Sequence, residues 1–352
     1  MKQHIEMQKF IKKIAIASII TSILGVLFML PCIYILPYQT GDLGRLGGIP
    51  FGPYDTIFKI PDFLYTENIM NYDSLQNVEI LTIGDSFSQG DHIGYQNFLG
   101  HYLNKKVSNL RIDNLNGINT LTALLDKGMI PNCRVIIIES VERYVVNGLC
   151  AEPIINNDIL KYKIISGAPI IFHTQDTIKR HHLFDIKELT SYYKNYFNSF
   201  SNNKVLTLSK LLFTAGKYSD KLFIYTSPKD YNNDLSFLNI TEEKIQKATI
   251  RLAELKSLEK KHKIKIIFLV AADKYDMYYD YIKDNPYPIN PILSSFSEFD
   301  STFFVNTKNI LLPYLKNGEK DIYRVNDTHW SVKAAEIVGN HLGRIIDTFF
   351  EE

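Results

Sequence analysis

The sequence predicts an α/β protein, a three-layer sandwich with a mostly parallel central sheet, preceded by one transmembrane helix. Three observations predict it. Nearly continuous apolar segments of strand length alternate with segments of helix length, which is typical of a sheet covered by helices on both faces. One uncharged apolar run near the N-terminus is long enough to span a bilayer. Hydrophobic residues make up 45% and charged residues 22% of the 352 positions, which is the balance of a packed globular protein.

Strand and helix patterns alternate through most of the chain. Apolar runs predict strands at 77–83, 134–140 and 264–270. Apolar positions at helical spacing predict helices at 94–105, 120–129, 241–261 and 331–350. Thr241 is the expected N-cap of the third helix. This order is that of βαβ units, whose strands run parallel.

The N-terminal apolar run occupies residues 14–36 and contains no charged side chain. It exceeds the apolar core of a cleavable signal peptide, the alternative interpretation, and no clear cleavage site follows it. Four lysines precede it: Lys2, Lys9, Lys12 and Lys13. The positive-inside rule places residues 1–13 in the cytoplasm. We therefore expect a single-pass protein of the bacterial inner (cytoplasmic) membrane, held by the lipid bilayer, with a periplasmic or extracellular α/β domain.

The exported part is expected to contain a spacer and one domain. Residues 37–75 hold several glycines and prolines and predict an irregular spacer. The α/β domain is expected over residues 76–350. Between about 144 and 225 the alternation weakens into a Tyr-, Asn- and Lys-rich stretch with helical pieces such as 186–200. We interpret this stretch as an insertion that forms a lid or a substrate platform.

Composition and spacing exclude several classes of function. The formal net charge is +1 and the basic residues are scattered, so no nucleic-acid partner is expected. The cysteines show no CxxC spacing and no histidine pair has a carboxylate at ligand spacing, so we expect no metal site. Phosphate-binding and dinucleotide fingerprints do not occur, so no cofactor is expected. Cys133 and Cys150 could pair in an oxidising compartment, with free thiols as the alternative.

The first chemical motif, GDSFSQG at residues 84–90, follows a predicted strand and precedes a predicted helix. A serine hydroxyl is a poor nucleophile at neutral pH, and acyl transfer needs it exposed on a tight turn beside a base. Open α/β sheets place such sites at the carboxyl ends of their strands. We therefore interpret Ser86 as a candidate nucleophile, with an ordinary capping turn as the alternative.

The second motif, NDTHW at residues 326–330, precedes the last predicted helix. A carboxylate two residues from an imidazole can hold its tautomer and stabilise the imidazolium, as the acid of a catalytic triad does. Asp327 and His329 are therefore the candidate acid and base, with a helix cap and a surface histidine as the alternative. Trp330, the single tryptophan, could wall the site or stack on a sugar.

GDSF with a later DTHW resembles the SGNH (GDSL) hydrolase superfamily, and within it the branch of the alginate O-acetylation proteins and other DHHW-type envelope proteins. The resemblance covers about residues 75–350 and implies an SGNH-type, flavodoxin-like fold in which Ser86, Asp327 and His329 form the triad. The stretch Ala272-Asp273-Lys274 is similar to a P-D-K stretch of that branch, with alanine in place of the proline. This similarity makes Lys274 a candidate site residue.

The sequence departs from that family in three places. GDSF precedes DTHW here, as in ordinary GDSL hydrolases and unlike the alginate proteins. The glycine that donates an oxyanion amide would be Gly117, beside Asn116, with an ordinary turn as the alternative. The GxND block is missing, and residues 139–143 instead resemble a Glu-x-x-Glu-Arg run of the alginate-type branch. Asp85 and Arg143 complete the candidates for oxyanion or substrate binding.

Together the motifs predict an exported serine acyl-ester enzyme that works through an acyl-Ser86 intermediate. The resemblance and the anchor favour an O-acetyltransferase acting on a cell-envelope or extracellular polysaccharide, with an integral-membrane acyl donor as an expected partner. Two alternatives stay open: a carbohydrate O-acetyl esterase with the same residues, and a non-catalytic polysaccharide-binding or assembly protein with the same fold.

Overall fold

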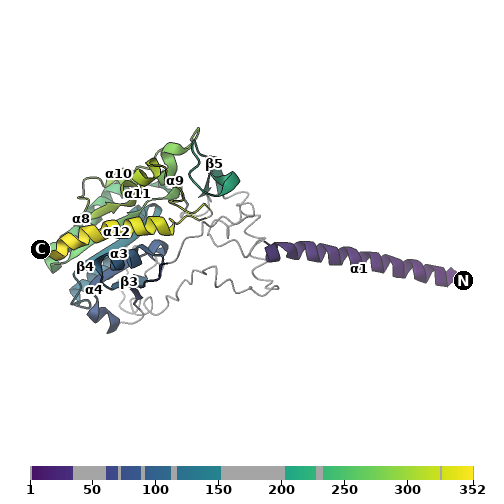
Figure 1. Ribbon diagram of the computed structural model, residues 1–352, viewed down its shortest axis with the longest axis horizontal. Coiled ribbons are helices and arrows are strands. Elements are labelled where there is room, and N and C mark those ends of the chain that lie inside the picture. The colour runs from purple at the N-terminus through teal and green to yellow at the C-terminus, as the bar shows by residue number, and fades with distance from the viewer. Residues whose placement is uncertain are drawn as a thin grey trace.

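The computed structural model describes residues 2–34, 61–69, 73–88, 92–111, 117–151, 203–226, 233–325 and 327–351. Its centre is a six-stranded sheet in the order β1-β3-β2-β4-β7-β8, and every neighbouring pair is parallel (Figure 1). The prediction of an α/β fold with a mostly parallel sheet is therefore confirmed. The strands are β1 (Thr66–Asn68), β2 (Ile80–Gly84), β3 (Val107–Arg111), β4 (Val135–Val141), β7 (Lys265–Ala271) and β8 (Phe304–Asn306).

The strand order fixes where a ligand site can form. Numbered along the chain, the strands β3, β2, β4, β7 and β8 have the order 2-1-3-4-5 that is common among doubly wound sheets. The chain leaves β2 toward one side of the sheet and later returns to β4 on the other side. Ligands bind outside the carboxyl ends of the strands at such a switch point. Here that place is the end of β2 beside the end of β4.

Helices on both faces explain the apolar character of the strands. All residues of β2 and β4 are buried, which is why these strands read as continuous apolar runs rather than alternating ones. On one face α3 (Tyr95–Leu103) packs against α12 (Val332–Glu351), and α11 (Thr307–Lys316) packs against α12. On the other face α4 (Gly117–Asp126) and α5 (Glu142–Leu149) pack against α8 (Glu242–His262). Right-handed crossovers place these two groups on opposite faces.

Helices α3 and α12 lie side by side because glycines allow a close approach (Figure 1). A Cβ atom added at Gly339 would lie 2.5 Å from the carbonyl oxygen of Tyr95. One added at Gly343, a turn further on, would collide with the Tyr102 ring. The two helices thus bury their shared face. Because α12 begins just after the predicted His329 motif, this packing fixes the end of the segment that carries His329.

The cap of the long helix α8 is as predicted. Thr241 precedes the helix with an extended backbone, and its hydroxyl accepts a hydrogen bond from the Lys244 amide at 3.3 Å. Glu242 and Glu243 in the first turn, and basic residues in the last, suit the helix dipole. The helix is followed by β7, which pairs with β4 along its whole length.

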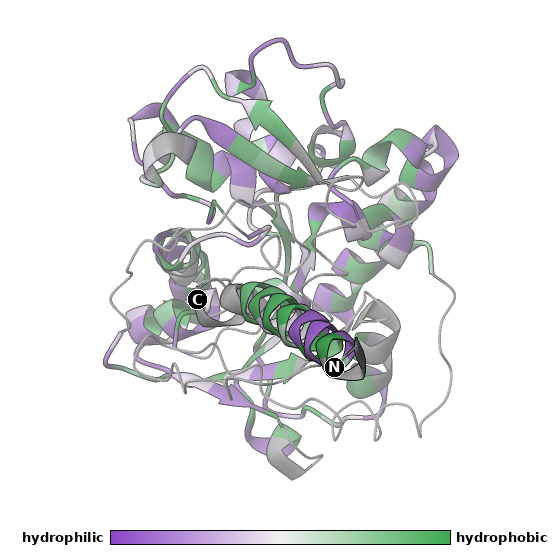
Figure 2. Ribbon diagram, turned by 90° about the vertical axis from the view of Figure 1, so that its right-hand side faces the viewer, coloured by the Kyte–Doolittle hydropathy of each residue, from purple (hydrophilic) through white to green (hydrophobic). Residues whose placement is uncertain are grey.

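Helix α1 (Lys2–Tyr34) stands apart from the α/β body (Figure 1). Its segment Ile5–Phe28 is long and apolar enough to cross a membrane, and none of it is buried inside the protein. Figure 2 shows hydrophobic residues around the helix, with hydrophilic residues toward its N-terminal end. The predicted span, 14–36, extends beyond the described residues at its C-terminal end, so the structure describes residues 14–34 of it as helix.

Two predicted boundaries differ from the structure. The spacer was expected to run to residue 75, but residues 66–68 form β1, the edge strand beside β3. Three residues are too few to show a strand pattern, and the pairing comes from the open edge of β3. The insertion was expected to begin near 144, but residues 142–149 form α5, which packs on α8.

The second half of the predicted insertion forms an antiparallel pair of strands. These are β5 (Asn203–Thr207) and β6 (Lys221–Tyr225), and β6 contacts α9 (Lys274–Tyr278) beyond the end of β7. A bridge between Leu208 and Ile282 adds a further link to the body. The helical piece expected at 186–200 lies outside the described residues. Cys133 and Cys150 are free thiols in the structure.

Candidate active site

The chain makes a tight turn directly after β2. The Ser88 amide donates to the carbonyl oxygen of Asp85 at 3.0 Å, and the Phe87 amide donates to the Asp85 carboxylate at 3.0 Å. Both bonds are accepted by Asp85, the residue before the short 3₁₀ turn Ser86–Ser88, and they fix the start of that turn. Ser86 is half-buried, so its hydroxyl is presented at the carboxyl edge of the sheet. The predicted strand-turn context of Ser86 is thus present.

Acidic side chains tie this turn to β4. The Asp85 carboxylate also accepts the Val141 amide at 2.9 Å, which joins the turn to the end of β4. Glu139 Oε2 accepts the Asp85 amide at 3.1 Å and the Ser88 hydroxyl at 2.8 Å. Burial, and next the negative charge of Asp85, raise the pKa of Glu139 well above its usual range. The neutral form of Glu139 is therefore favoured relative to that of an exposed carboxyl group, while its Oε2 supports the turn.

Gly84 leaves the space that this arrangement needs. A Cβ atom there would lie 2.5 Å from Glu139 Oε2 and still closer to the Ser88 hydroxyl. The first glycine of the GDSF motif is thus required by the approach of Glu139 to the turn. Sequence reasoning noticed residues 139–143 only as a run similar to a family motif. The physical signal for Glu139 was an ionisable residue within an otherwise apolar strand.

The second motif lies on a short loop between α11 and α12. Tyr323 and Trp330 form an antiparallel bridge at its base. The Arg324 amide donates to the His329 carbonyl at 3.2 Å, and the Ser331 amide donates to the Ile322 carbonyl at 2.9 Å. We call residues 322–331 the His loop. Its closed base places Asp327 and His329 at the carboxyl edge of the sheet.

Folding brings the two motifs together although 243 positions separate Ser86 and His329 in the chain. His329 Nε2 lies 2.6 Å from Ser86 Oγ, and His329 Nδ1 lies 2.5 Å from Asp327 Oδ1. A carboxylate can only accept, so Nδ1 carries the proton shared with Asp327 and Nε2 faces the serine hydroxyl as an acceptor. Asp327 Oδ1 also accepts the His329 amide at 3.0 Å, which fixes the side chain of the acid.

The electrostatics of the Asp327–His329 pair favour the charged acid. Burial alone would raise the pKa of Asp327. The positive charge that His329 carries once it is protonated, its hydrogen bonds and the nearby Arg324 outweigh burial, so that the pKa of Asp327 lies well below its usual range. An ionised Asp327 stabilises the imidazolium that forms when His329 takes a proton from Ser86.

Aromatic rings line the inner side of this pair. Phe87 lies against the His329 ring with centroids 4.7 Å apart, and it meets Trp330 edge-on at 4.8 Å. Trp330 also meets Tyr95 edge-on at 6.2 Å and is only 6% exposed. The indole therefore packs behind Phe87, on the side away from the edge of the sheet. Its two expected roles, as a wall of the site and as a ring that stacks on a sugar, stay predictions.

The other candidate residues have varied positions. Lys274 is fully buried, and its ammonium group binds backbone carbonyls of the His loop. Arg143 is 8% exposed and pairs with Asp234 at 3.1 Å and with Asp273. Burial raises the pKa of Asp273 to about 8 against the opposing charge of Arg143. Contact of either basic residue with a substrate stays a prediction, since both are engaged inside the protein.

The predicted oxyanion donors are placed only in part. Gly117 is the first residue of α4, which follows β3, and β3 pairs with β2, the strand before the Ser86 turn. Asn116 lies outside the described residues. The role of Gly117 as an amide donor stays a prediction, and Asp85 serves the backbone of the turn as described above. Among the described residues, no group of three or more His, Cys, Asp or Glu side chains is arranged to hold a metal ion.

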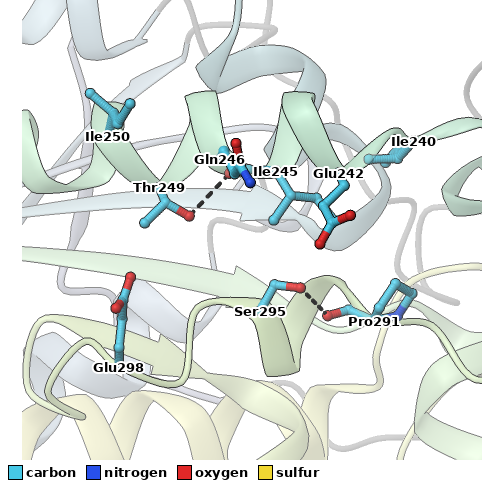
Figure 3. A pocket seen from close by; sticks show the side chains of 9 residues that line it. All are labelled: Ile240, Glu242, Ile245, Gln246, Thr249, Ile250, Pro291, Ser295 and Glu298. Carbon is cyan, nitrogen blue, oxygen red and sulfur yellow. Dashed lines mark hydrogen bonds between the residues drawn. The ribbon is translucent and has the colours of Figure 1, made fainter.

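A second hollow lies between the start of α8 and the segment around α10 (Ile292–Ser295) (Figure 3). This groove, of about 710 Å³, shares no residue with the Ser86 site. Two of its hydroxyls are engaged within their own segments: Thr249 donates to the Ile245 carbonyl at 3.0 Å and Ser295 to the Pro291 carbonyl at 2.8 Å. None of the residues that line the groove belongs to the Ser86 site.

Comparison with known proteins adds no relative: no family model, no curated protein and no solved structure matches the chain. The geometry of the site therefore carries the functional interpretation.

Proposed function

We propose that the protein is an SGNH-type serine acyl-ester enzyme in which Ser86 is the nucleophile, His329 the base and Asp327 the acid. The observation that supports it most is the 2.6 Å separation of Ser86 Oγ and His329 Nε2. This distance is within the hydrogen-bond reach that a nucleophile and its base need. It also disfavours the non-catalytic alternative, for which no proton transfer between the two residues is needed.

The chemistry follows from the contacts of the three residues. Ser86 Oγ attacks the acyl carbonyl carbon while its proton passes to His329 Nε2. The tetrahedral intermediate collapses, the bond to the departing oxygen breaks, and His329 returns the proton to that oxygen. An acceptor hydroxyl then gives its proton to His329 and attacks acyl-Ser86. The bond between the acyl carbon and Ser86 Oγ breaks, and His329 returns the proton to Ser86 Oγ. Asp327 stays ionised and holds the imidazole in the orientation needed for both transfers.

The neighbouring serine is excluded as the nucleophile by its surroundings. Ser88 is 1% exposed, and its hydroxyl binds Glu139 at 2.8 Å and the Tyr95 hydroxyl at 3.2 Å. A substrate carbonyl has no route to that atom. Ser86 and His329, in contrast, are both partly exposed at the carboxyl edge of the sheet.

The favoured reaction is transfer of an acetyl group to a hydroxyl of a cell-envelope or extracellular polysaccharide. The resemblance of GDSF and DTHW to the alginate-type branch supports it. The apolar helix α1 also supports it, because an anchored enzyme stays beside a polymer that is assembled at the membrane. On this proposal the α/β domain lies on the far side of the bacterial inner membrane from residues 1–13. A carbohydrate O-acetyl esterase uses the same three residues, with water as the acceptor.

Turnover of p-nitrophenyl acetate by the detergent-solubilised full chain tests the proposal. The assay is run with and without two soluble tetrasaccharides, one neutral and one built of uronic acids. Acetylated tetrasaccharide in the mass spectrum supports transfer, and acetate release that ignores the sugars supports the esterase. No turnover by the wild type above that of the Ser86→Ala protein would overturn the enzyme assignment.

A further inference from the structure

Of the lysines that the structure describes, Lys274 is the one whose side chain is buried. It is the first residue of α9 and follows the end of β7, the strand next to β4 in the sheet. A buried ammonium group is costly unless each of its protons has an acceptor. The environment of Lys274 must therefore supply such acceptors.

The acceptors are three backbone carbonyls of the His loop. Lys274 Nζ donates to the oxygens of Arg324 at 2.7 Å, Val325 at 2.9 Å and Asp327 at 3.0 Å. An ammonium group has three N–H donors, so these bonds use its hydrogen-bonding capacity. Arg324, Val325 and Asp327 belong to neither a helix nor a strand. Lys274 Nζ donates to these carbonyls as a backbone N–H does in a strand or helix.

One of these carbonyls belongs to the triad acid. Asp327 is thus held twice: Lys274 fixes its backbone, and the imidazole of His329 binds its carboxylate. The base of the loop is held separately, by Tyr323, whose amide donates to the Tyr278 hydroxyl at 3.2 Å and whose hydroxyl donates to the Ala272 carbonyl. Lys274 therefore acts on a different part of the loop from those contacts.

Asp321, the residue before the His loop, is hydrogen-bonded to the segment between β5 and β6. The Asp321 amide donates to the Leu212 carbonyl at 3.0 Å. The Asp321 carboxylate accepts the Thr214 amide at 2.9 Å and the Thr214 hydroxyl at 2.7 Å. The Phe213 ring lies 5.5 Å from Lys274 Nζ and covers it. The lysine is therefore enclosed between the His loop and this segment.

Building on the acyl transfer proposed for Ser86, we propose that Lys274 is a positioning residue that sets the placement of Asp327 and His329 by binding the carbonyls of the His loop. Without the ammonium group, three carbonyls lose their donors and the backbone of Asp327 can shift. A misplacement of about 1 Å can cost about 100-fold in rate. The effect falls on kcat, because Lys274 acts through His329 and not on a bound substrate.

The test compares Lys274→Met with Lys308→Met in the full chain. Lys308 is a matched control because it is also largely enclosed, on the neighbouring α11, where its ammonium group pairs with Asp276 at 3.0 Å. We expect Lys274→Met to lower kcat for p-nitrophenyl acetate about 100-fold with little change in KM. Lys308→Met lowers stability and leaves the kcat of the folded protein near that of the wild type. Equal kcat for folded Lys274→Met and the wild type would overturn the assignment.

A nuclear magnetic resonance readout separates this inference from the enzyme proposal, since it needs no turnover. The Nδ1 proton of His329 in its hydrogen bond to Asp327 gives a downfield signal, which should be sharp in the wild type and in Lys308→Met and lost in Lys274→Met. Persistence of the signal in Lys274→Met contradicts the positioning role even if the wild type proves inactive. A wild type without turnover but with loss of the signal in Lys274→Met rejects only the enzyme assignment.

A wild-type measurement covers the case in which Lys274→Met does not fold. In protein labelled with ¹⁵N-lysine, one ammonium group should exchange its protons slowly with water and show cross-relaxation to Val325. Fast exchange of every lysine ammonium group would show that the three-carbonyl contact is not formed, and would overturn the inference.

Discussion

The turn that carries Ser86 and the loop that carries His329 meet at one edge of the sheet, but buried groups of opposite character hold them. In the turn, backbone N–H groups donate to the carboxyl groups of Asp85 and Glu139. In the His loop, backbone carbonyls accept from the ammonium group of Lys274. Asp85 belongs to the turn itself, Glu139 to β4, and Lys274 to α9, which follows β7.

The turn also has a support within itself. Asp85 is part of the turn it supports, and Glu139 lies on β4, 54 positions from Asp85. Lys274 lies 53 positions from Asp327, on a different element that follows β7. The Ser86 turn is thus held by its own aspartate as well as by a tertiary contact, whereas Lys274 reaches the His loop through the tertiary fold. The predictions below probe the loop first and then the turn.

The largest effect is expected from Asp327→Asn. The amide cannot accept the Nδ1 proton as a carboxylate does, so the imidazole loses the tautomer that faces Ser86 with an acceptor. Loss of the triad acid in this way lowers kcat by about 10⁴-fold. Steady-state rates with p-nitrophenyl acetate measure it, and Asp347→Asn on the exposed side of α12 serves as the control. Rates within about tenfold of the wild type would mean that Asp327 does not orient His329.

A smaller but still large effect is expected from Gly84→Ala in the turn. The new Cβ would overlap the Ser88 hydroxyl and lie 2.5 Å from Glu139 Oε2. Overpacking of this kind costs about 1–3 kcal/mol in the free energy of unfolding. The displaced turn should lower kcat by about 100-fold, since Ser86 moves from its base. Urea unfolding and steady-state rates measure both effects.

Gly25→Ala is the control for that substitution, because no atom lies within 4 Å of the position of its Cβ. If Gly84→Ala kept the rate and the stability of the control, the packing of Glu139 against the turn would not set the position of Ser86. The comparison of the two supports would then lose its first half.

The smallest effect is a pH dependence of stability that comes from Glu139. The unfolded chain releases this proton near a pKa of about 4.3, whereas the folded protein keeps it because burial and Asp85 raise the pKa of Glu139. Above that pH the folded state binds more protons, so the free energy of unfolding falls as the pH rises toward the raised pKa. One proton contributes up to about 1.4 kcal/mol per pH unit in this window.

Glu139→Gln keeps an oxygen that accepts from Asp85 and Ser88 but has no proton to lose. As the pH rises above the unfolded pKa of about 4.3, we expect the free energy of unfolding of this variant to decline less steeply than that of the wild type. Urea unfolding at a series of pH values measures the slopes, and Glu254→Gln on the exposed face of α8 is the control. Parallel slopes for the Glu139→Gln variant and the wild type would show that Glu139 is ionised when folded.

The difference between local sequence patterns and contacts of remote residues explains which elements the sequence could predict. Strands β2, β4 and β7 and the helices α3, α4, α8 and α12 were predictable because apolar runs such as residues 264–270 show their period directly. Ser86 and His329 were predictable because each stands in a local motif beside a predicted element. Strands β3 and β8 and helix α11 were not predicted. Strand β1, with three residues, and the start of α5 were also missed, because their placement depends on pairing with β3 and packing on α8.

The supports of the site were harder to predict than its reacting groups. Nothing near Lys274 in the sequence indicates that its acceptors are carbonyls 50 to 53 positions away. Sequence reasoning therefore treated Lys274 and Arg143 as ligands of a substrate, whereas the structure places both in internal contacts. The burial of Trp330 behind Phe87 likewise follows from the tertiary fold of the His loop.

Labelling of the full chain with a fluorophosphonate, followed by peptide mass spectrometry, tests the pairing of Ser86 with His329 most directly. The reagent bonds to a serine oxygen only where a base removes the hydroxyl proton. We expect the adduct on Ser86 in the wild type, no adduct on Ser88, and loss of labelling in His329→Ala. An unlabelled wild type, or an adduct on Ser86 that forms equally fast without His329, would contradict the proposed site.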